Sequence, residues 1–365
     1  MSIRALLSDL FDAGHLRANP DPFFDRAPVA QAVPWSRVEG MLLGLAIGDS
    51  LGNRSESMLP DQRLRMHGEI RDYLPNRYAG GQAVGVPSDD TQMAFFALEE
   101  RLAGTAFDPA ALARRFANET IFGMGGSVRA FVRNHRNGVP WQQAATDSAG
   151  NGALMRIASV LVPHVRSPST DLWAEAAVNT MLTHNCPAAI GASVAWVAML
   201  WELLSMRAAP TPEWWLDRFV DVCQRVEGDV AMSPRGGAYR ARREPLAAFT
   251  QHVVTTARSG NRSALDACND WYSGAFLMET VPSVIYILER HGHDPEEAIV
   301  RAVNDTKDND TVAAIVGAAM GALHGSERLP LRWREGLLGR IRADDDGSVQ
   351  ALLSRARGRW FDAGA

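Results

Sequence analysis

The sequence predicts an all-α protein in which a bundle of many helices follows an N-terminal extension. From Val38 almost to the end of the chain, apolar residues recur at the three- and four-residue spacing of helices. Stretches with the apolar and polar alternation typical of half-buried strands are scarce. No internal repeat, low-complexity tract or linker divides the chain after residue 36. We therefore expect two regions, an extension over residues 1–36 and one helical domain over residues 37–365.

The composition indicates a soluble globular protein with a large core. Of the 365 residues, 46% are hydrophobic and 22% are charged. The net charge of −5 argues against nucleic acid as a partner, because binding a phosphate backbone needs a basic face. No apolar run approaches membrane length, and the three cysteines are too far apart for a disulfide framework or a zinc motif. These features predict a cytoplasmic protein that binds neither membranes nor nucleic acid.

The N-terminal extension is predicted to contain a short helix and an extended arm. Ile3, Leu6, Leu7 and Leu10 recur at helical spacing, and prolines at positions 20, 22, 28 and 34 favour an extended chain. A helix this short is marginal in water, so its apolar face needs a surface to lie on. That surface is either the protein's own domain or a partner, and the sequence leaves both possibilities open.

The domain is predicted to begin with a buried helix over residues 38–47. This stretch is apolar, and Gly40, Gly44 and Gly48 occur at every fourth residue. Such a stripe leaves bare backbone on one helix face and permits close packing against another helix. The chain is expected to leave the helix over residues 49–56. A glycine-containing loop then leads to a helix that begins at Ser88 as its N-cap.

Helical periodicity continues through most of the remaining chain. The segment from Arg235 to Arg243 interrupts it and is predicted to be a mobile surface loop whose charges are solvated. The further predicted helices cover residues 108–118, 124–134, 152–161, 171–183, 186–205, 212–225, 243–257, 275–289 and 294–304.

Two predicted helix starts each carry a hydroxyl group and a pair of acids. Each start alone has an ordinary explanation, because acids and hydroxyls cap helices and interact favourably with the helix dipole. Two acids and a hydroxyl in one turn exceed the needs of capping, and their like charges repel on desolvation. If the two starts converge, their oxygens suit a pair of hard cations, as in binuclear hydrolases. The residues are Ser88, Asp89 and Asp90 in one start and Asp308, Asp310 and Thr311 in the other.

Five motifs in order resemble the ADP-ribosylglycohydrolase family, over about residues 38–325. They are Gly44-Leu-Ala-Ile-Gly-Asp-Ser-Leu-Gly52 with Glu56, Ser88-Asp-Asp-Thr-Gln-Met93, Asn151-Gly-Ala-Leu-Met-Arg-Ile157, Thr183-His184 and Asp308-Asn-Asp-Thr-Val-Ala-Ala-Ile-Val-Gly317. The resemblance implies an orthogonal all-α bundle that binds two Mg²⁺ or Mn²⁺ ions. It also implies hydrolysis of the bond between C1″ of ADP-ribose and a modified protein side chain, with arginine as the default.

The resemblance assigns roles by motif position. It implies that the six residues of the two acidic helix starts hold the metal ions, and that Glu56 or Asp89 transfers the proton. Asn151 and Gly152 are implied to line the ADP-ribose pocket. His184 is implied to contact the nucleotide, although a lone histidine is as often structural. Arg156 is expected to pair with an acid in the core.

The match departs from the family pattern before the second acidic motif, where Thr306-Lys307 replaces a pair of glycines. This change leaves the backbone approach to the ligand open. The same stretch, together with the N-terminal extension, resembles a subgroup of immunity proteins that oppose type VI secreted ADP-ribosyltransferase toxins. In that case residues 1–36 are expected to block the cognate toxin directly, in addition to the hydrolysis. The alternative is a non-catalytic inhibitor that acts only by occluding the toxin's active site.

Overall fold

The computed structural model describes residues 2–362, and this part of the chain is helical without a β-strand, as predicted. Residue 1 of the predicted extension and residues 363–365 of the predicted domain lie outside it. The α-helices are α1 (Ile3–Asp12), α2 (Trp35–Gly52), α3 (Pro60–His67), α4 (Asp89–Ala103), α5 (Pro109–Asn118), α6 (Gly126–Arg136), α7 (Trp141–Ala144), α8 (Asp171–Met181), α9 (Pro187–Leu203), α10 (Pro212–Glu227), α11 (Leu246–Ser259), α12 (Ala264–Asp270), α13 (Leu277–His291), α14 (Pro295–Asp305), α15 (Asn309–His324), α16 (Leu331–Gly336) and α17 (Ser348–Arg357).

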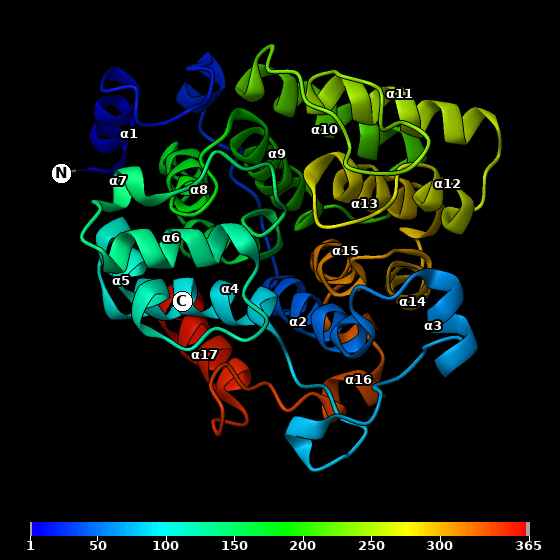
Figure 1. Cartoon of the computed structure of the whole chain (residues 1–365). Coiled ribbons are helices and arrows are strands. Elements are labelled where there is room, and N and C mark those ends of the chain that lie inside the picture. The colour runs from blue at the N-terminus through cyan, green and yellow to red at the C-terminus, as the bar shows by residue number, and fades with distance from the viewer. Residues whose placement is uncertain (1, 363–365) are drawn as a thin grey trace.

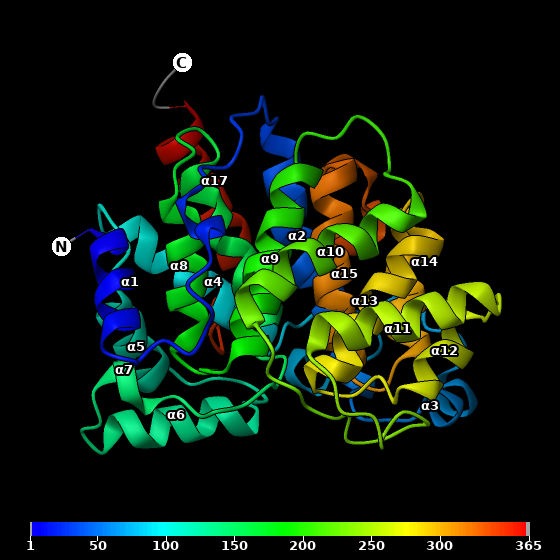
Figure 2. The same cartoon turned by 90° about the horizontal axis from the view of Figure 1, so that it is seen from above.

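The centre of the fold is the pair formed by α2 and α15, which lie side by side in both views (Figure 1, Figure 2). Their backbones touch along the predicted glycine stripe. A Cβ atom on Gly44 would lie 2.0 Å from the carbonyl oxygen of Gly317, and one on Gly48 would lie 2.0 Å from that of Ala313. Only glycine permits this approach, so the prediction of close helix packing is confirmed.

The other helices surround the central pair in two groups. In Figure 1, α10 to α13 gather on one side of α2 and α15, whereas α4, α5, α6 and α17 lie on the other. The long apolar helix α9 runs between them and is buried along nearly its whole length. Over the residues described, no helix has the length and hydropathy needed to span a bilayer.

Several predicted elements differ from the observed ones. Helix α2, predicted over residues 38–47, continues to Gly52 and then into a 3-10 turn to Ser55. The chain therefore leaves the helix later than predicted. Residues 152–161 were expected to form an α-helix, but the chain forms 3-10 helix over Leu154–His164, where Pro163 lacks the N–H that an α-helix needs. Helices α3, α7, α12, α16 and α17 were not predicted. The first four have eight residues or fewer, and one or two turns carry little periodicity.

The N-terminal extension packs on its own domain. Leu7 and Leu10 are buried in the core cluster, and the Phe23 ring lies 5.0 Å from the Trp173 ring of α8. Trp173 Nε1 donates to the carbonyl of Arg26, and Trp201 Nε1 of α9 donates to that of Val29. The sequence left open whether the extension lies on the protein's own domain or on a partner. The described part of the extension lies on its own domain.

Candidate active site

Three helix ends carry buried acids to one place. Asp49 lies in the last turn of α2, Asp90 in the first turn of α4 and Asp310 in the first turn of α15. A Cβ atom on Gly52 would lie 2.4 Å from Cα of Asp310, so the end of α2 is in contact with the start of α15. The close glycine packing of the central helices therefore fixes the distance between their acids.

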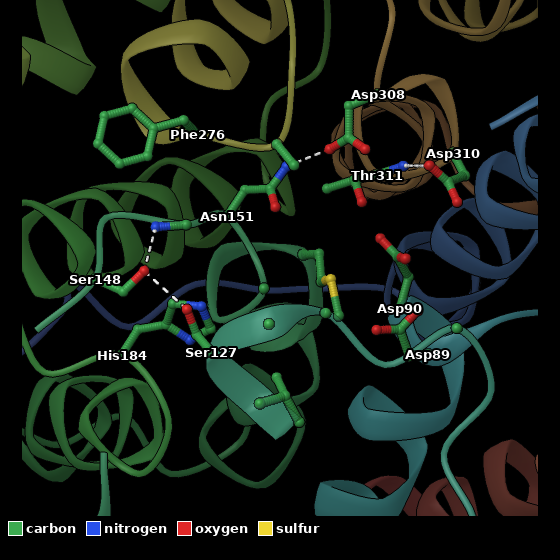
Figure 3. A pocket seen from close by; sticks show the side chains of 18 of the residues that line it. Asp89, Asp90, Ser127, Ser148, Asn151, His184, Phe276, Asp308, Asp310 and Thr311 are labelled. Atoms are coloured by element: carbon green, nitrogen blue, oxygen red, sulfur yellow. Dashed lines mark hydrogen bonds between the residues drawn. The ribbon is translucent and has the colours of Figure 1, made fainter. Parts of the chain in front are cut away.

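The carboxylates form two overlapping groups in which the oxygens lie within 4.8 Å of one another. One group contains Asp49, Asp90 and Asp310, and the other contains Glu56, Asp308 and Asp310. Figure 3 shows Asp90 facing Asp308 and Asp310, with Thr311 on the same side of the gap. The two acidic helix starts identified in the sequence thus lie together beside one cleft of about 330 Å³.

Asp49 caps helix α4 from a different helix. Its carboxylate accepts hydrogen bonds from the backbone N–H groups of Ser88 (2.8 Å) and Thr91 (3.1 Å). It also accepts bonds from both hydroxyls, at 2.6 Å from Ser88 and 2.5 Å from Thr91. Ser88 occupies the N-cap position, as predicted, but among the described residues its side chain makes no capping bond to the helix, and Asp49 caps it instead. Sequence reasoning missed Asp49 because its partners lie about 40 residues further along the chain.

Burial and mutual repulsion raise the pKa values of the clustered acids. Burial is the larger cause for Asp90, Asp310 and Asp308, and neighbouring carboxylates add to it for Asp90 and Asp310. Asp90 Oδ1 is buried, and no donor of residues 2–362 lies within hydrogen-bond distance of it. An acceptor left without a donor among desolvated acids is costly, and a divalent cation supplies the missing positive charge. The residues present therefore fit a hard cation.

These pKa shifts predict how stability depends on pH. A carboxyl group with a raised pKa holds its proton in the folded state at pH values where the unfolded chain has lost it. Burial and the charges of Asp308 and Asp49 raise the pKa of Glu56 to about 7, from an ordinary value near 4.5. The metal-free protein should therefore lose stability as the pH rises from about 5 to about 8. Thermal unfolding in EDTA measures this slope.

Added Mg²⁺ or Mn²⁺ should act in the opposite direction. Protons compete with cations for the same oxygens, so the cation should raise the unfolding temperature more at pH 8 than at pH 6. The variant Asp310→Asn serves as the control. It should weaken both the dependence of stability on pH and the increase in unfolding temperature with added cation. A cation effect that is independent of pH would contradict the assignment of these acids to a cation site.

The remaining members of the two acidic starts line the same cleft. Asp89, Asp90, Asp308, Asp310 and Thr311 all face it. Asp89 belongs to neither three-carboxylate group of the described residues, and burial with the nearby charge of Asp49 raises its pKa. The predicted ligand roles of Ser88, Asp89 and Thr311 stay predictions.

Asn151, Gly152 and His184 lie together in the wall of the cleft, as Figure 3 shows for the two labelled side chains. Asn151 Nδ2 donates to Asp308 Oδ2 at 2.6 Å, so this residue holds an acid as well as lining the wall. His184 is buried, its Nδ1 lies 2.8 Å from the Thr183 hydroxyl, and its pKa is lowered to about 3 by burial and by Arg156. The imidazole is thus neutral.

Two arginines make contacts that were not predicted. Arg156 was expected to pair with an acid, but its guanidinium donates to the carbonyls of Gly152 and Asn179 and to the Thr183 hydroxyl. Arg235 was placed in a solvated surface loop, and its side chain is 53% exposed, but it also lines the cleft. It bonds to the fully buried Glu279 and lies 5.1 Å from the centre of the Phe276 ring. Neither partner is near Arg235 in the sequence, so no local signal marks the contact.

Arg63 of α3 links the two loops that carry Glu56 and Asp308 by hydrogen bonds. It is fully buried, and every N–H of its guanidinium is used. Nε and one terminal nitrogen donate to the Ser55 hydroxyl, the Ser55 carbonyl and the Met58 carbonyl. The other terminal nitrogen donates to the carbonyls of Asn304 and Thr306. The turn that bears Glu56 is therefore tied to the segment before Asp308.

Replacing Arg63 with lysine should remove several of the hydrogen bonds that link the two loops. A lysine ammonium keeps the charge but cannot reproduce the planar fork, so several buried carbonyls lose their donors. We expect a loss of about 2–4 kcal/mol in the free energy of unfolding, measured with a chemical denaturant. Arg301→Lys, in the exposed network with Glu69 and Glu297, should cost less than about 1 kcal/mol. Equal losses of unfolding free energy in the two variants would refute the role of Arg63 in linking the two loops.

The fold and the site together define a class: all-helical enzymes with a buried carboxylate cluster at the end of a glycine-packed helix pair. The sequence matches the ADP-ribosylglycohydrolase family over residues 30–361. The chain belongs to this family and is an enzyme of it, which confirms the resemblance seen in the motifs.

The comparisons with individual proteins agree with the family. An uncharacterized protein of Archaeoglobus fulgidus is 31% identical over 81% of this chain and 90% of its own length. ADP-ribosylarginine hydrolase Tri1 of Pseudomonas putida is 28% identical over 82% of this chain and 73% of its own. A solved structure described as an ADP-ribosylglycohydrolase-related protein complex has a TM-score of 0.60 at 24% identity, covering 88% of this chain and 98% of its own. That likeness supports the fold.

Proposed function

We propose that this enzyme removes ADP-ribose from modified protein side chains, with two divalent cations, Mg²⁺ or Mn²⁺, bound by the acid cluster. The carrying observation is the pair of three-carboxylate groups that share Asp310, beside a cleft and with one buried oxygen of Asp90 unpartnered. Two hard cations are the partners that such a set of oxygens prefers. The family gives the substrate class.

The residues of the cleft suit the parts of ADP-ribose. Gly126, Ser127 and Val128 of the first turn of α6 line the cleft, where backbone N–H groups have no helical partner and suit a diphosphate. Arg235 adds a positive charge at the same wall, and Phe276 offers an aromatic surface. The ribose that carries the scissile bond then lies at the carboxylates.

Hydrolysis requires that a water oxygen bonds to C1″ as the bond from C1″ to the side-chain nitrogen breaks. The departing nitrogen gains a proton, and the water loses one. When bound, divalent cations supply Lewis acidity that holds sugar hydroxyls and lowers the pKa of a coordinated water. Glu56 is the favoured proton carrier, because its side chain is exposed to the cleft beside the carboxylate cluster. Asp89 is the alternative, at the same cleft but buried.

Two variants separate these proton carriers. Glu56→Gln should lower kcat by about 10²–10⁴-fold and remove the limb of the pH–rate profile that reports the titration of Glu56. Asp89→Asn should leave that limb in place. The reverse pattern would assign proton transfer to Asp89.

The activity itself is tested on a protein that carries ADP-ribose on arginine. Arginine is the linkage favoured by the family resemblance, and the relative from Pseudomonas putida is named for it. ADP-ribose should be released with Mg²⁺ or Mn²⁺, release should stop in EDTA, and added cation should restore it. Release that is unaffected by EDTA would reject the role of the cations. Release from serine but not from arginine would reject the linkage.

We further propose a biological role as a cytoplasmic immunity protein that reverses the action of a secreted ADP-ribosyltransferase toxin. The support is the resemblance at residues 304–311 and in the extension, together with three cysteines that are free and buried. The extension would then bind the toxin by the face that it leaves open, where Val29 is 76% exposed. The alternative is an inhibitor that only occludes the toxin.

Asp308→Ala distinguishes reversal from occlusion. If the enzyme reverses the modification, the wild type should remove ADP-ribose from targets that are already modified, and this variant should not. If it only occludes the toxin, one equivalent should still protect. Val29→Asp tests the extension without uncovering Trp173 or Trp201, and it should weaken toxin binding while hydrolysis continues. Unchanged binding would remove the extension from the interface.

A further inference from the structure

Three cavities meet at Glu56. The first is the cleft with Asn151 and His184, the second is lined by Tyr272 and Lys307, and the third by Arg54 and Arg77. If the nucleotide occupies the first, as the proposed function requires, the modified polypeptide must leave through one of the other two.

The third cavity forms a groove on the surface beside the acid cluster. At about 560 Å³ it is larger than the second, at about 350 Å³. Its lining comes from five separate segments, which are the turn after α2, the turn around Tyr78, the loop before α4, the loop between α5 and α6, and the loop before α17. We call it the acceptor groove; it is lined by Asn53, Arg54, Glu56, Asn76, Arg77, Tyr78, Val86, Pro87, Ser88, Phe122, Gly123, Arg340, Ala343 and Asp344.

The acceptor groove is lined by three arginines and by two acids, Glu56 and Asp344. Arg54 and Arg77 are exposed, and within residues 2–362 neither forms an ion pair with a carboxylate. Arg54 Nε donates to the carbonyl of Pro75, and the Arg77 guanidinium lies 4.7 Å from the centre of the Tyr78 ring and donates to its hydroxyl. Arg340 also lines the groove, but it is paired with Asp346.

The second cavity is smaller and is also lined by cations. Lys307 lies over the Tyr272 ring and donates to its hydroxyl, and Arg235 is held by Glu279. Within residues 2–362 the acceptor groove has two cations without a carboxylate partner, Arg54 and Arg77, and the second cavity has one, Lys307. The larger volume and the second unpaired cation favour the acceptor groove.

We propose that the acceptor groove binds the polypeptide segment next to the modified side chain and selects segments with acidic residues. This inference rests on the proposed function and adds the chemistry of the protein substrate to it. Carboxylates of the segment would pair with Arg54 and Arg77 while the linked side chain reaches Glu56. Such contacts at the rim of a site act through charge complementarity, so they weaken with salt.

The test compares two peptides that carry one ADP-ribosylated arginine, flanked by glutamates in one and by lysines in the other. The wild-type enzyme should show a higher kcat/KM for the glutamate peptide, by about tenfold at low salt, and the advantage should shrink as salt is added. The double variant Arg54→Glu, Arg77→Glu should lose or reverse the preference. A matched double variant, Arg133→Glu with Arg240→Glu, changes the net charge equally outside the groove and should keep it.

Free ADP-ribosylarginine separates failure of this inference from failure of the proposed function. If the wild-type enzyme hydrolyses the free compound and hydrolyses the two peptides at equal rates, the proposed role of the acceptor groove is wrong. The proposed activity then still holds. Equal loss of preference in both double variants would also overturn the groove, because it would report only long-range charge. If the free compound and both peptides resist hydrolysis, the proposed function fails and the inference with it.

Discussion

Asp310→Asn should abolish hydrolysis and still stabilise the metal-free protein. Asp310 is the acid shared by both carboxylate groups, so its loss should weaken both cation positions. Loss of Lewis-acid stabilisation worth several kcal/mol corresponds to a fall in kcat of about 10³-fold or more. Burial and four neighbouring acids raise the pKa of Asp310, so the neutral amide should also relieve repulsion when no cation is bound.

Two measurements on Asp310→Asn are needed, because a misfolded variant would also be inactive. Thermal unfolding in EDTA should give a higher midpoint than the wild type, and added Mg²⁺ or Mn²⁺ should no longer raise it. Asp305→Asn is the matched control, since Asp305 is a buried acid five residues earlier that pairs with Arg301 and lies outside both groups. It should keep activity near the wild-type level. An active Asp310→Asn enzyme would contradict the proposed centre.

Gly44→Ala should have the largest effect on the fold. The added Cβ would lie 2.0 Å from the carbonyl oxygen of Gly317 and 2.7 Å from its carbonyl carbon, and both atoms are backbone. The overlap can be relieved only by moving α15 away from α2. We expect a loss of about 3 kcal/mol or more in the free energy of unfolding, measured by chemical denaturation, and a parallel loss of cation binding.

The position of the substitution should decide its effect. Gly317→Ala places its Cβ 2.1 Å from the Gly44 carbonyl oxygen and should reproduce the loss from the other helix. Gly358→Ala meets nothing within 4 Å and should change stability by no more than about 0.5 kcal/mol. If Gly44→Ala unfolds like Gly358→Ala, the glycine contact does not hold the central helices together.

The proposed cation site depends on this helix packing. Asp49 and Asp310 come from the ends of α2 and α15, and a shift between the helices changes the distance between their carboxylates. Arg63 then ties Glu56 to the segment before Asp308. The acids are therefore positioned by backbone contact between α2 and α15 and by the buried hydrogen bonds of Arg63. Neither of these contacts lies in the cleft itself.

The sequence by itself determined the helical class, the glycine stripe, the two acidic helix starts and the family. These features are local, since helical periodicity, a stripe at every fourth residue and a motif can each be recognised within a few turns. Only the tertiary structure decided that Asp49 caps α4, that Arg235 turns into the cleft, that Arg63 joins two loops and that the extension lies on α8 and α9. Each of these contacts joins residues that are distant in the chain, and their pairing follows from how the helices pack, which no local pattern specifies.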